Sequence, residues 1–576
     1  MRTRTVRLRA RATPFAAQAR RASGGVRTKV APMSREGALK ARIKELEAMV
    51  AALTLKQGMR IAHNDDDDPV RTVRNPVVDD EGRPPVFLAR SRVAGRRVAG
   101  RRGRRRTTVK KSASLHLKRL GLPKMKMWEL RLRRELDVSG RPNMDRRHWS
   151  TFVRLVLPSM KNLVTFDISN NRISGDEAKE LGKVLTGNQV MTKLNMASNS
   201  LDWNRENERG LDGVVAISNA ISTMRALTSF DISNNDIRAE GSKLLAEALK
   251  DNQVMRELNI ADNNMSNYDS DMSGIIAISN AIPTMGALTR LNLSNNEMLT
   301  KRAGKALAGA LASNAVLREL DVSKQGGGAE YDDGPGFAME LADGLGTNGA
   351  LTSLNISSCD IGELVLPDGW TREWMWEEFQ GKGYKHSDGR KQEERPGKPE
   401  GAIAIANAIK NNGSLVKLNL SKCCLHGAES GKAVGDMLAS NTSLKELDLS
   451  GYGPDSFASS DAEFAQAFAV GLSANGVLTS LDISNNNLAK GSRKNPDWTH
   501  VRGKYDDYYI HKDGKKQKYR EPADLYLREI SGVLALADAI KNNGVLTSLD
   551  LGHNNFRKKE KATLRACQSK TLSLVL

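Results

Sequence analysis

The sequence predicts an α/β solenoid in which outer helices cover a parallel inner sheet and a disordered basic tail precedes the repeats. Two observations carry this prediction. The pattern LVTFDISNNRI, which begins at Leu163, recurs in the same frame to give eleven copies. Most copies are separated by an Ala- and Leu-rich stretch of helical periodicity, such as GSKLLAEALKDNQ from Gly241. Self-similarity of this kind indicates a repeat architecture rather than one globular core.

Each copy places apolar residues at fixed offsets and ends its strand with a polar residue, usually Asn. The copies begin at Leu163, Met191, Leu227, Met255, Leu288, Leu317, Leu351, Leu415, Leu444, Leu478 and Leu546. One strand–turn–helix unit cannot bury its own apolar face, so its neighbours must supply the missing wall. The Asn amide can bond backbone groups that leave the sheet ladder, and Cys359 and Cys423 take its place in two copies.

This frame resembles the leucine-rich repeat, in which Asn or Cys fills the same slot. Closely spaced copies begin 28 or 29 residues apart, which is similar to the ribonuclease-inhibitor-like class of Ran GTPase-activating proteins and NOD-like receptors. The resemblance covers roughly residues 130–576 and implies a horseshoe with a parallel inner sheet and outer helices. It implies no activity by itself, because function resides in sites carried by a fold.

The basic charge of the chain is confined to its first part. The whole chain has 88 Lys and Arg, 67 Asp and Glu, and a net charge of +21. Residues 1–120 alone hold 31 basic and 10 acidic residues, so the remainder is neutral as a group. Residues 1–34 contain no acidic residue and resemble an organellar transit peptide, with a disordered tail as the alternative.

We divide the chain into five regions. They are a basic tail (1–34), a short coiled-coil-like helix (35–57), a disordered basic linker (58–115), an amino-terminal cap (116–162) and the solenoid (163–576). The heptad seam at 39–53 fits a weak parallel dimer and fits equally well a helix that packs on nothing. The Arg-rich run at 90–111 has no interleaved aromatic residue, so it favours a solvated linker, with non-specific contact to nucleic acid or an acidic surface as the alternative.

Two insertions, at 362–400 and 489–530, interrupt the array after equivalent repeats of a duplicated block. Both contain Trp, then Tyr, then H-x-D-G-x-K-Q, and Asp-Gly between β-prone residues predicts a small hairpin. The first insertion resembles a WW domain in its LP-x-GW opening. However, Glu393 stands where that family has a second Trp for proline-rich ligands, and Lys518 stands there in the second insertion. A degenerate structural hairpin is therefore the alternative to a ligand-binding one.

Aromatic residues of the insertions are the candidate partner-binding residues, because such side chains usually anchor protein interfaces. They are Trp370, Trp374, Trp376, Tyr384, Trp498, Tyr505, Tyr508 and Tyr509. Because both insertions follow equivalent turns, we expect them to leave the same edge of the array and to hold one protein partner at two points. The basic residues Arg390, Lys391, Lys515 and Lys516 favour an acidic partner.

The inner sheet offers a second, concave surface. In each strand the residue between the paired apolar positions points to solvent. The acidic members of this concave column are Asp167, Asp231, Asp321, Asp448, Asp482 and Asp550, and Asn fills the other five places. This surface is small and polar and lacks aromatic anchors, so we interpret the column mainly as a repeat consensus whose side chains bond one another.

No motif indicates an enzyme. The eight His residues are scattered, and neither H-E-x-x-H, a Cys/His cluster at metal spacing nor G-x-S-x-G occurs. We therefore expect no catalytic residue, cofactor or metal, and no run of apolar residues is long enough for a transmembrane helix. The four Cys are too few for a disulfide framework, and we expect reduced thiols.

These observations predict a scaffold that binds proteins inside the cell, in the cytoplasm or the nucleus. Import into an organelle by residues 1–34 is the alternative location. Regulation of a small GTPase, as implied by the Ran GTPase-activating resemblance, is the alternative function.

Overall fold

The structure is a computed structural model that describes most of the repeat region. It describes residues 127–141, 146–204, 208–268, 270–326, 333–365, 367–375, 381–392, 397–453, 461–489, 497–501, 508–518 and 530–576. The expected tail (1–34), short helix (35–57) and linker (58–115) lie outside the described residues, as does the first part of the cap.

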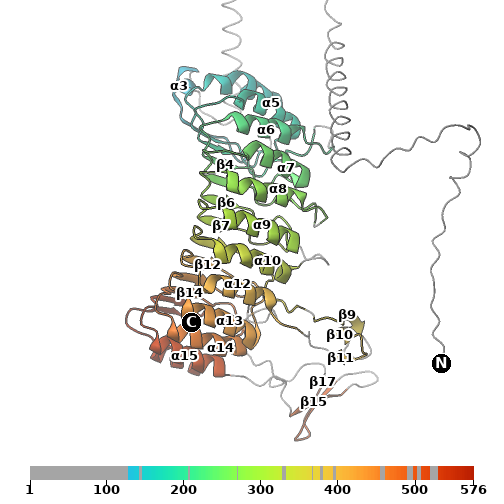
Figure 1. Cartoon of the computed structure of the whole chain (residues 1–576), viewed down its shortest axis with the longest axis vertical. Helices are drawn as coiled ribbons and strands as arrows, with labels where there is room; N and C mark the ends of the chain where they lie inside the picture. Colours follow the sequence, from blue (N-terminus) through green and yellow to red (C-terminus); the bar gives the residue numbers. More distant parts are fainter. Residues whose placement is uncertain are drawn as a thin grey trace, which may run out of the picture. The chain divides into compact units, whose positions relative to one another are not determined.

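One parallel sheet runs through the described repeats, and its thirteen strands are hydrogen-bonded in chain order (Figure 1). The strands are β1 (Glu135–Asp137), β2 (Thr165–Asp167), β3 (Lys193–Asn195), β4 (Ser229–Asp231), β5 (Glu257–Asn259), β6 (Arg290–Asn292), β7 (Glu319–Asp321), β8 (Ser353–Asn355), β12 (Lys417–Asn419), β13 (Glu446–Asp448), β14 (Ser480–Asp482), β18 (Ser548–Asp550) and β19 (Ser573–Val575). Neighbours pair without a register shift, so that Leu320 lies between Leu291 and Leu354. All eleven copies of the frame supply a strand, which confirms the predicted inner sheet.

Helices return the chain from the end of one strand to the start of the next, and they cover one face of the sheet (Figure 1). Parallel strands require such crossovers. The helices are α3 (Met127–Leu132), α4 (Arg146–Thr151), α5 (Gly175–Leu185), α6 (Asp212–Thr223), α7 (Arg238–Leu249), α8 (Ser273–Ala281), α9 (Lys301–Ser313), α10 (Gly334–Thr347), α12 (Glu400–Lys410), α13 (Gly427–Ser440), α14 (Ala462–Ala474), α15 (Ser531–Asn542) and α16 (Lys558–Ala566). Small residues let helices approach closely: a Cβ on Gly471 would lie 1.9 Å from the carbonyl oxygen of Gly435.

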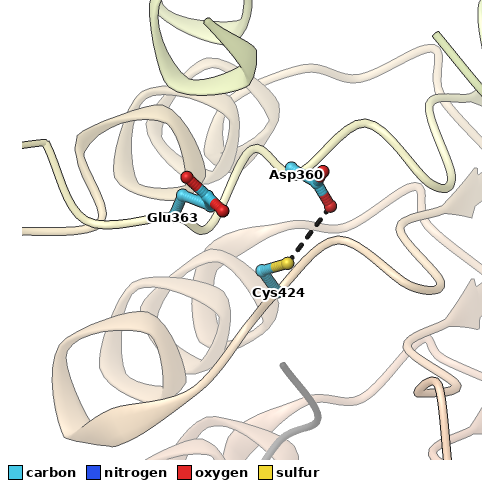
Figure 2. A group of neighbouring side chains, drawn as sticks. All are labelled: Asp360, Glu363 and Cys424. Atoms are coloured by element: carbon cyan, nitrogen blue, oxygen red, sulfur yellow. Dashed lines mark hydrogen bonds between the residues drawn. The ribbon is translucent and has the colours of Figure 1, made fainter. Parts of the chain in front are cut away.

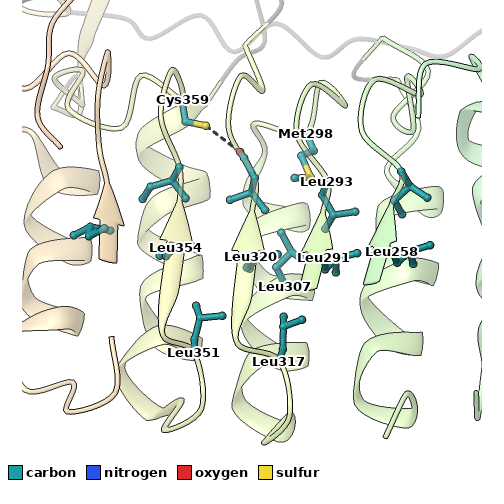
Figure 3. Close-up of a cluster of buried hydrophobic side chains, with 14 of the residues drawn as sticks. Leu258, Leu291, Leu293, Met298, Leu307, Leu317, Leu320, Leu351, Leu354 and Cys359 are labelled. Carbon is teal, nitrogen blue, oxygen red and sulfur yellow. Dashed lines mark hydrogen bonds between the residues drawn. The ribbon is translucent and has the colours of Figure 1, made fainter. Parts of the chain in front are cut away.

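Apolar side chains from the strands and helices form one continuous core between the two layers (Figure 3). Leu317 and Leu320 of one repeat are 0% and 2% exposed, and the equivalent Leu351 and Leu354 of the next repeat are each 1% exposed. Because the repeats stack in register, each of these leucines is enclosed by its counterparts before and after it. The predicted inward positions of the frame are therefore confirmed.

The Asn after each strand forms a ladder beneath the turns. The Asn235 side-chain amide donates to the carbonyl oxygen of Met196 in the preceding repeat at 3.0 Å, and the Asn235 backbone N–H donates to Asn263 Oδ1 in the next repeat at 3.0 Å. In the same slot, the Cys359 thiol donates to the carbonyl oxygen of Val322 at 3.2 Å. The slot thus satisfies backbone groups that the sheet leaves unpaired, as the sequence predicts.

Atypical elements close the two ends of the array. β1 pairs with β2, and a π-helical turn (Phe152–Val156) and a 3₁₀ turn (Leu157–Ser159) follow α4 at the first end. A second 3₁₀ turn (Ile282–Thr284) follows α8 inside the array. Trp149 and Phe152 are buried, the Phe152 ring packs against that of Phe166 on β2, and β19 pairs with β18 at the other end. The described part of the expected cap (116–162) thus adds one strand to the start of the sheet, and the cap itself stays a prediction.

Each insertion contains a three-stranded antiparallel sheet. The strands are β9 (Trp370–Met375), β10 (Gly381–His386) and β11 (Lys391–Gln392) in the first insertion, and β15 (Trp498–Val501), β16 (Tyr508–His511) and β17 (Lys516–Lys518) in the second. The prediction of a two-stranded hairpin at the Asp-Gly turn was incomplete, because β9 and β15 add a strand to the other side. A third strand favours independent stability, since an isolated hairpin is marginal in water.

Candidate functional site

The turns that enter the strands are short and closed by Asn side chains. Asn314 Oδ1 accepts a hydrogen bond from the backbone N–H of Leu317 at 2.7 Å, and its amide donates to the carbonyl oxygen of Ile282 at 3.1 Å. Asn348 repeats this arrangement in the next turn, where its amide donates to the Leu311 carbonyl oxygen at 2.7 Å. The polar groups of this edge are therefore used to join successive repeats.

The loops that leave the strands are longer and carry aromatic side chains, each beside a cation. We call these loops, with the two insertions, the βα-loop edge. Its cation–π pairs are Trp203 with Arg209 at 4.5 Å, Tyr268 with Arg238 at 5.8 Å, Trp370 with Arg390 at 5.7 Å, Tyr452 with Lys422 at 6.0 Å, and Tyr508 with Lys516 at 5.4 Å. Every cation–π pair found in the described part of the chain lies on this edge.

Arg209 fixes the first aromatic loop through two carboxylates. Its guanidinium lies 3.0 Å from the Asp202 carboxylate and 2.8 Å from the Asp236 carboxylate, and it stacks on Trp203. Asp202 is buried, and its Oδ1 has no hydrogen-bond partner among the described residues. Burial, reinforced by the charge of Asp236, raises the pKa of Asp202 to about 6 although Arg209 opposes the shift. The arrangement ties the loop after β3 to the turn after β4.

The two insertions share one turn geometry. His386 lies opposite Trp370 in the first sheet and His511 lies opposite Trp498 in the second. In each turn the His Nδ1 lies beside the Asp two residues later, at 2.8 Å in the first insertion and 2.7 Å in the second. The equivalence supports the inference that both insertions arose with a duplicated block.

Hydrogen bonds within these turns stabilise the charged form of the Asp. The backbone N–H of Arg390, followed by the His386 and Arg390 side chains, lowers the pKa of Asp388. Lys515 and His511 lower the pKa of Asp513 in the same way. Arg390 and Lys515 therefore form ion pairs within their own turns, at 2.8 Å and 3.0 Å from the Asp388 and Asp513 carboxylates.

The structure places part of the predicted aromatic set. Trp370 is half-buried and packs against the His386 ring with 5.3 Å between centroids, while Tyr508 and Tyr509 are half-buried on β16. For the remaining candidates, Trp374, Tyr384 and Trp498 are placed on β9, β10 and β15 by their backbone, and Trp376 and Tyr505 lie outside the described residues.

The concave column bonds largely to itself. Asn195 donates to Asp167 at 2.9 Å, Asn259 donates to Asp231 at 2.9 Å, and Asn355 donates to Asp321 at 3.0 Å. A hollow of about 490 Å³ lies over β4 to β8, but its floor is this ladder. Within the hollow, the guanidinium of Arg290 pairs with Glu257.

Three aspartates of the column are adjacent without an intervening Asn. Asp482 lies between Asp448 and Asp550 in the parallel register. Burial raises the pKa of Asp482, and the charges of these two neighbours add to the shift, against the hydrogen bonds of Ser484 that lower it. In the first part of the column Asn side chains donate hydrogen bonds to the aspartates, whereas in the last part three neighbouring aspartates repel one another.

Three aromatic members of the βα-loop edge were missed by sequence reasoning, namely Trp203, Tyr268 and Tyr452. A signal for them exists in the spacing. The copies at Met191, Met255 and Leu444 are followed by steps of 36, 33 and 34 residues, longer than the shortest step of 28. The additional residues form loops on the side of the array from which the insertions leave. Long steps between copies therefore mark the βα-loop edge, in addition to the two insertions.

The parallel inner sheet, the covering helices and the two differently built edges define a repeat scaffold. The family model described as Leucine Rich repeat matches residues 223–246 and 350–363, which lie within the repeat array. Arrays of this kind present extended surfaces for protein partners. No curated protein matches the chain. Among the described residues, no helix is both long enough and apolar enough to cross a bilayer.

Three solved structures illustrate the likeness. Leiomodin-1 Actin-Binding Site 2 is 20% identical with a TM-score of 0.21, covering 30% of this chain and 88% of its own. The leucine-rich repeat-containing protein LegL7 from Legionella pneumophila is 16% identical with a TM-score of 0.34, covering 61% and 92%. An internalin from Listeria monocytogenes is 13% identical with a TM-score of 0.33, covering 80% and 93%. Identities and TM-scores this low carry no functional argument.

Proposed function

We propose that the chain is a non-enzymatic scaffold that holds a protein partner along its βα-loop edge. The observation that carries this proposal is the row of five aromatic–cation pairs, all on that edge. Aromatic and Arg side chains are the usual anchors of protein interfaces, because they bury a large area at a low entropic cost. Tyr268 and Tyr452 are 63% and 46% exposed, so they are accessible to a partner.

The other surfaces are less suited to this role. The opposite edge uses its Asn side chains to join the repeats, and the concave column uses its Asp and Asn side chains on one another. A partner that bound there would have to replace hydrogen bonds that are already made, at a desolvation cost. The βα-loop edge offers apolar rings without that cost.

The insertions extend the same edge at two points. They leave the sheet after β8 and β14, which are three strand positions apart. At a strand spacing of about 4.8 Å, the two points of departure are about 14 Å apart, so one protein domain can span them. Lys391 and Lys516 on the third strands add positive charge, which favours an acidic partner.

Deletion of the first insertion tests the proposal. Residues 367–396 are replaced by a short Gly-Ser linker, which retains the Val365–Lys398 pairing at the base of the insertion, where the backbone N–H of Val365 donates at 2.9 Å. Partner capture by the full chain and the melting temperature are then measured in parallel. Lost capture at an unchanged melting temperature supports the proposal, whereas retained capture with a lower melting temperature makes the insertion structural.

Point variants sharpen the test, because they leave the backbone in place. We expect Tyr268→Ala and Tyr508→Ala each to weaken partner binding about tenfold or more, as truncated anchor residues do. Val470→Ala on the outer helix α14 is the matched control, since this apolar side chain is 72% exposed but lies away from the edge. Equal losses in all three variants would contradict the proposed surface. Regulation of a small GTPase stays a prediction, which a GTPase-stimulation assay with the full chain tests.

A further inference from the structure

A thiol and two carboxylates converge where the first insertion leaves the array (Figure 2). Asp360 and Glu363 follow β8, and Cys424 follows β12. One donor atom from each residue lies within 4.8 Å of the other two. The Cys424 thiol donates to Asp360 Oδ1 at 3.2 Å, and the Tyr452 hydroxyl from the following repeat donates to the same oxygen at 3.3 Å. Three successive repeats therefore contribute to one donor set.

Stacking of the repeats brings this set together. Asp360 and Cys424 both follow the Asn slot of their repeats, which Cys359 and Cys423 fill. Both have the left-handed backbone conformation of that turn, with φ of 48° and 58°. They are 64 residues apart in the chain because the insertion lies between them. The sequence predicts no metal site, since no short spacing motif links the residues.

The Cys424 thiol is buried beside two carboxyl groups. Cys424 is 7% exposed, and its burial raises its pKa. The charges of Asp360 and Glu363 raise the pKa further, as does the adjacent thiol of Cys423. The thiol therefore lies beside two carboxylates, a mixed set of sulfur and oxygen donors that can bind a cation.

We propose that Asp360, Glu363 and Cys424 bind a zinc ion, with Tyr452 Oη or a water molecule as the fourth ligand. A thiolate with carboxylates suits zinc, whereas magnesium and calcium prefer sites made only of oxygen. Binding releases the thiol proton to solvent, and the metal–sulfur bond replaces the hydrogen bond to Asp360. Ligands on a zinc tetrahedron are about 3.5 Å apart, which is close to the 3.2 Å between Cys424 Sγ and Asp360 Oδ1.

The zinc ion joins the turn that leads into the first insertion to the next two repeats. It therefore holds the base of that insertion in place. This role differs from that of the neighbouring Cys423, which is 2% exposed and donates to the Ile356 carbonyl oxygen at 3.1 Å. Cys424 thus faces the candidate metal site, whereas the adjacent Cys423 faces the core. The two residues provide a matched pair of variants.

The test uses the full chain after removal of metal with a chelator. Zinc is titrated by calorimetry, and cobalt is titrated by absorption, since a thiolate ligand produces a sulfur-to-cobalt charge-transfer band. We expect one zinc ion per chain, a cobalt–thiolate band and a higher melting temperature with zinc. Cys424→Ser should abolish the cobalt–thiolate band and weaken zinc binding about a hundredfold. Cys423→Ser should retain the band and the wild-type affinity for zinc.

Two outcomes overturn the proposal. One is a chain that binds neither ion, or binds cobalt without the thiolate band. The other is zinc binding of equal affinity in the wild type, Cys424→Ser and Asp360→Asn, which identifies an adventitious ion elsewhere on the chain. Should Cys424→Ser fail to fold, Glu363→Gln provides the second variant, because Glu363 is half-exposed and its amide keeps the shape of the carboxylate. Unchanged zinc affinity in folded Glu363→Gln also refutes the proposal.

Discussion

Replacement of Leu354 by Asp tests whether the apolar frame holds the array together. Leu354 lies on β8 between Leu320 and Leu418, and it is 1% exposed. Truncation of such a leucine to Ala costs about 2–5 kcal/mol of stability. Asp adds the cost of a carboxylate that must be neutralised or must leave the core. We therefore expect Leu354→Asp to cost more than about 5 kcal/mol, which is the scale of the whole stability of a domain.

Ser353→Asp is the matched control, because it introduces the same side chain one residue earlier in the same strand. Ser353 faces solvent between Glu319 and Lys417, whose opposite charges offset each other. We expect the change in the free energy of unfolding to stay within about 0.5 kcal/mol, as for other surface substitutions.

Urea unfolding followed by far-ultraviolet circular dichroism measures both effects at 25 °C. Each repeat is stabilised by its neighbours, so Leu354→Asp should also remove the helical signal of several repeats before urea is added. Leu354→Ala supplies an intermediate point, about 2–5 kcal/mol below the wild type. Similar losses in Leu354→Asp and Ser353→Asp would refute the assignment of the inward frame, whatever their size.

Further predictions concern charge and the tail. Asp482→Asn should raise the free energy of unfolding at pH 7 by about 0.5 kcal/mol, because it removes repulsion by two aspartates. Asp231→Asn should lower it by about 1 kcal/mol, since this carboxylate accepts a hydrogen bond from an Asn; denaturant unfolding that shows the same sign for both contradicts the prediction. Stability should fall as the pH rises from about 4 to 6, by up to about 2 kcal/mol, because the folded pKa of Asp202 is about 6 and the unfolded value is about 4. Between these two pKa values the folded chain keeps a proton on Asp202 that the unfolded chain has lost. Asp202→Asn should therefore remove the fall in melting temperature across this pH range. Deletion of residues 1–115 should leave the melting temperature of the array unchanged within about 2 °C, and a larger loss would show that the tail supports the fold.

The prediction of strands, helices and core succeeds for a physical reason. In a repeat array each unit packs against copies of itself. The repeating pattern therefore predicts both whether a residue is buried and which residues of the adjacent repeats it contacts. Leu354 is buried because Leu320 and Leu418 share its position, and the frame shows all three. The Asn slot is equally legible, because its partners are backbone groups at a constant offset. Even the replacement of Asn by Cys359 preserves the bond that the slot requires.

The strand β9 was not predicted, because its formation depends on pairing across residues outside the H-x-D-G motif. Asp-Gly specifies a local turn between β10 and β11, whereas β9 joins through six registered pairs with β10. Local turn chemistry is visible in a sequence, but the number of strands that join a sheet is decided by packing and pairing of the whole insertion.

The sequence by itself determined the inner sheet, the inward leucines and the place of the insertions, since these follow from a period that every repeat shares. Only the tertiary structure decided which exceptional residues meet. Asp360 and Cys424 lie 64 residues apart and approach because the insertion leaves the stack without breaking its register. Trp203 and Arg209 are paired by the burial of Asp202, which holds the guanidinium over the ring. Periodic positions are encoded by repetition, whereas contacts between exceptions depend on where stacking and burial bring them.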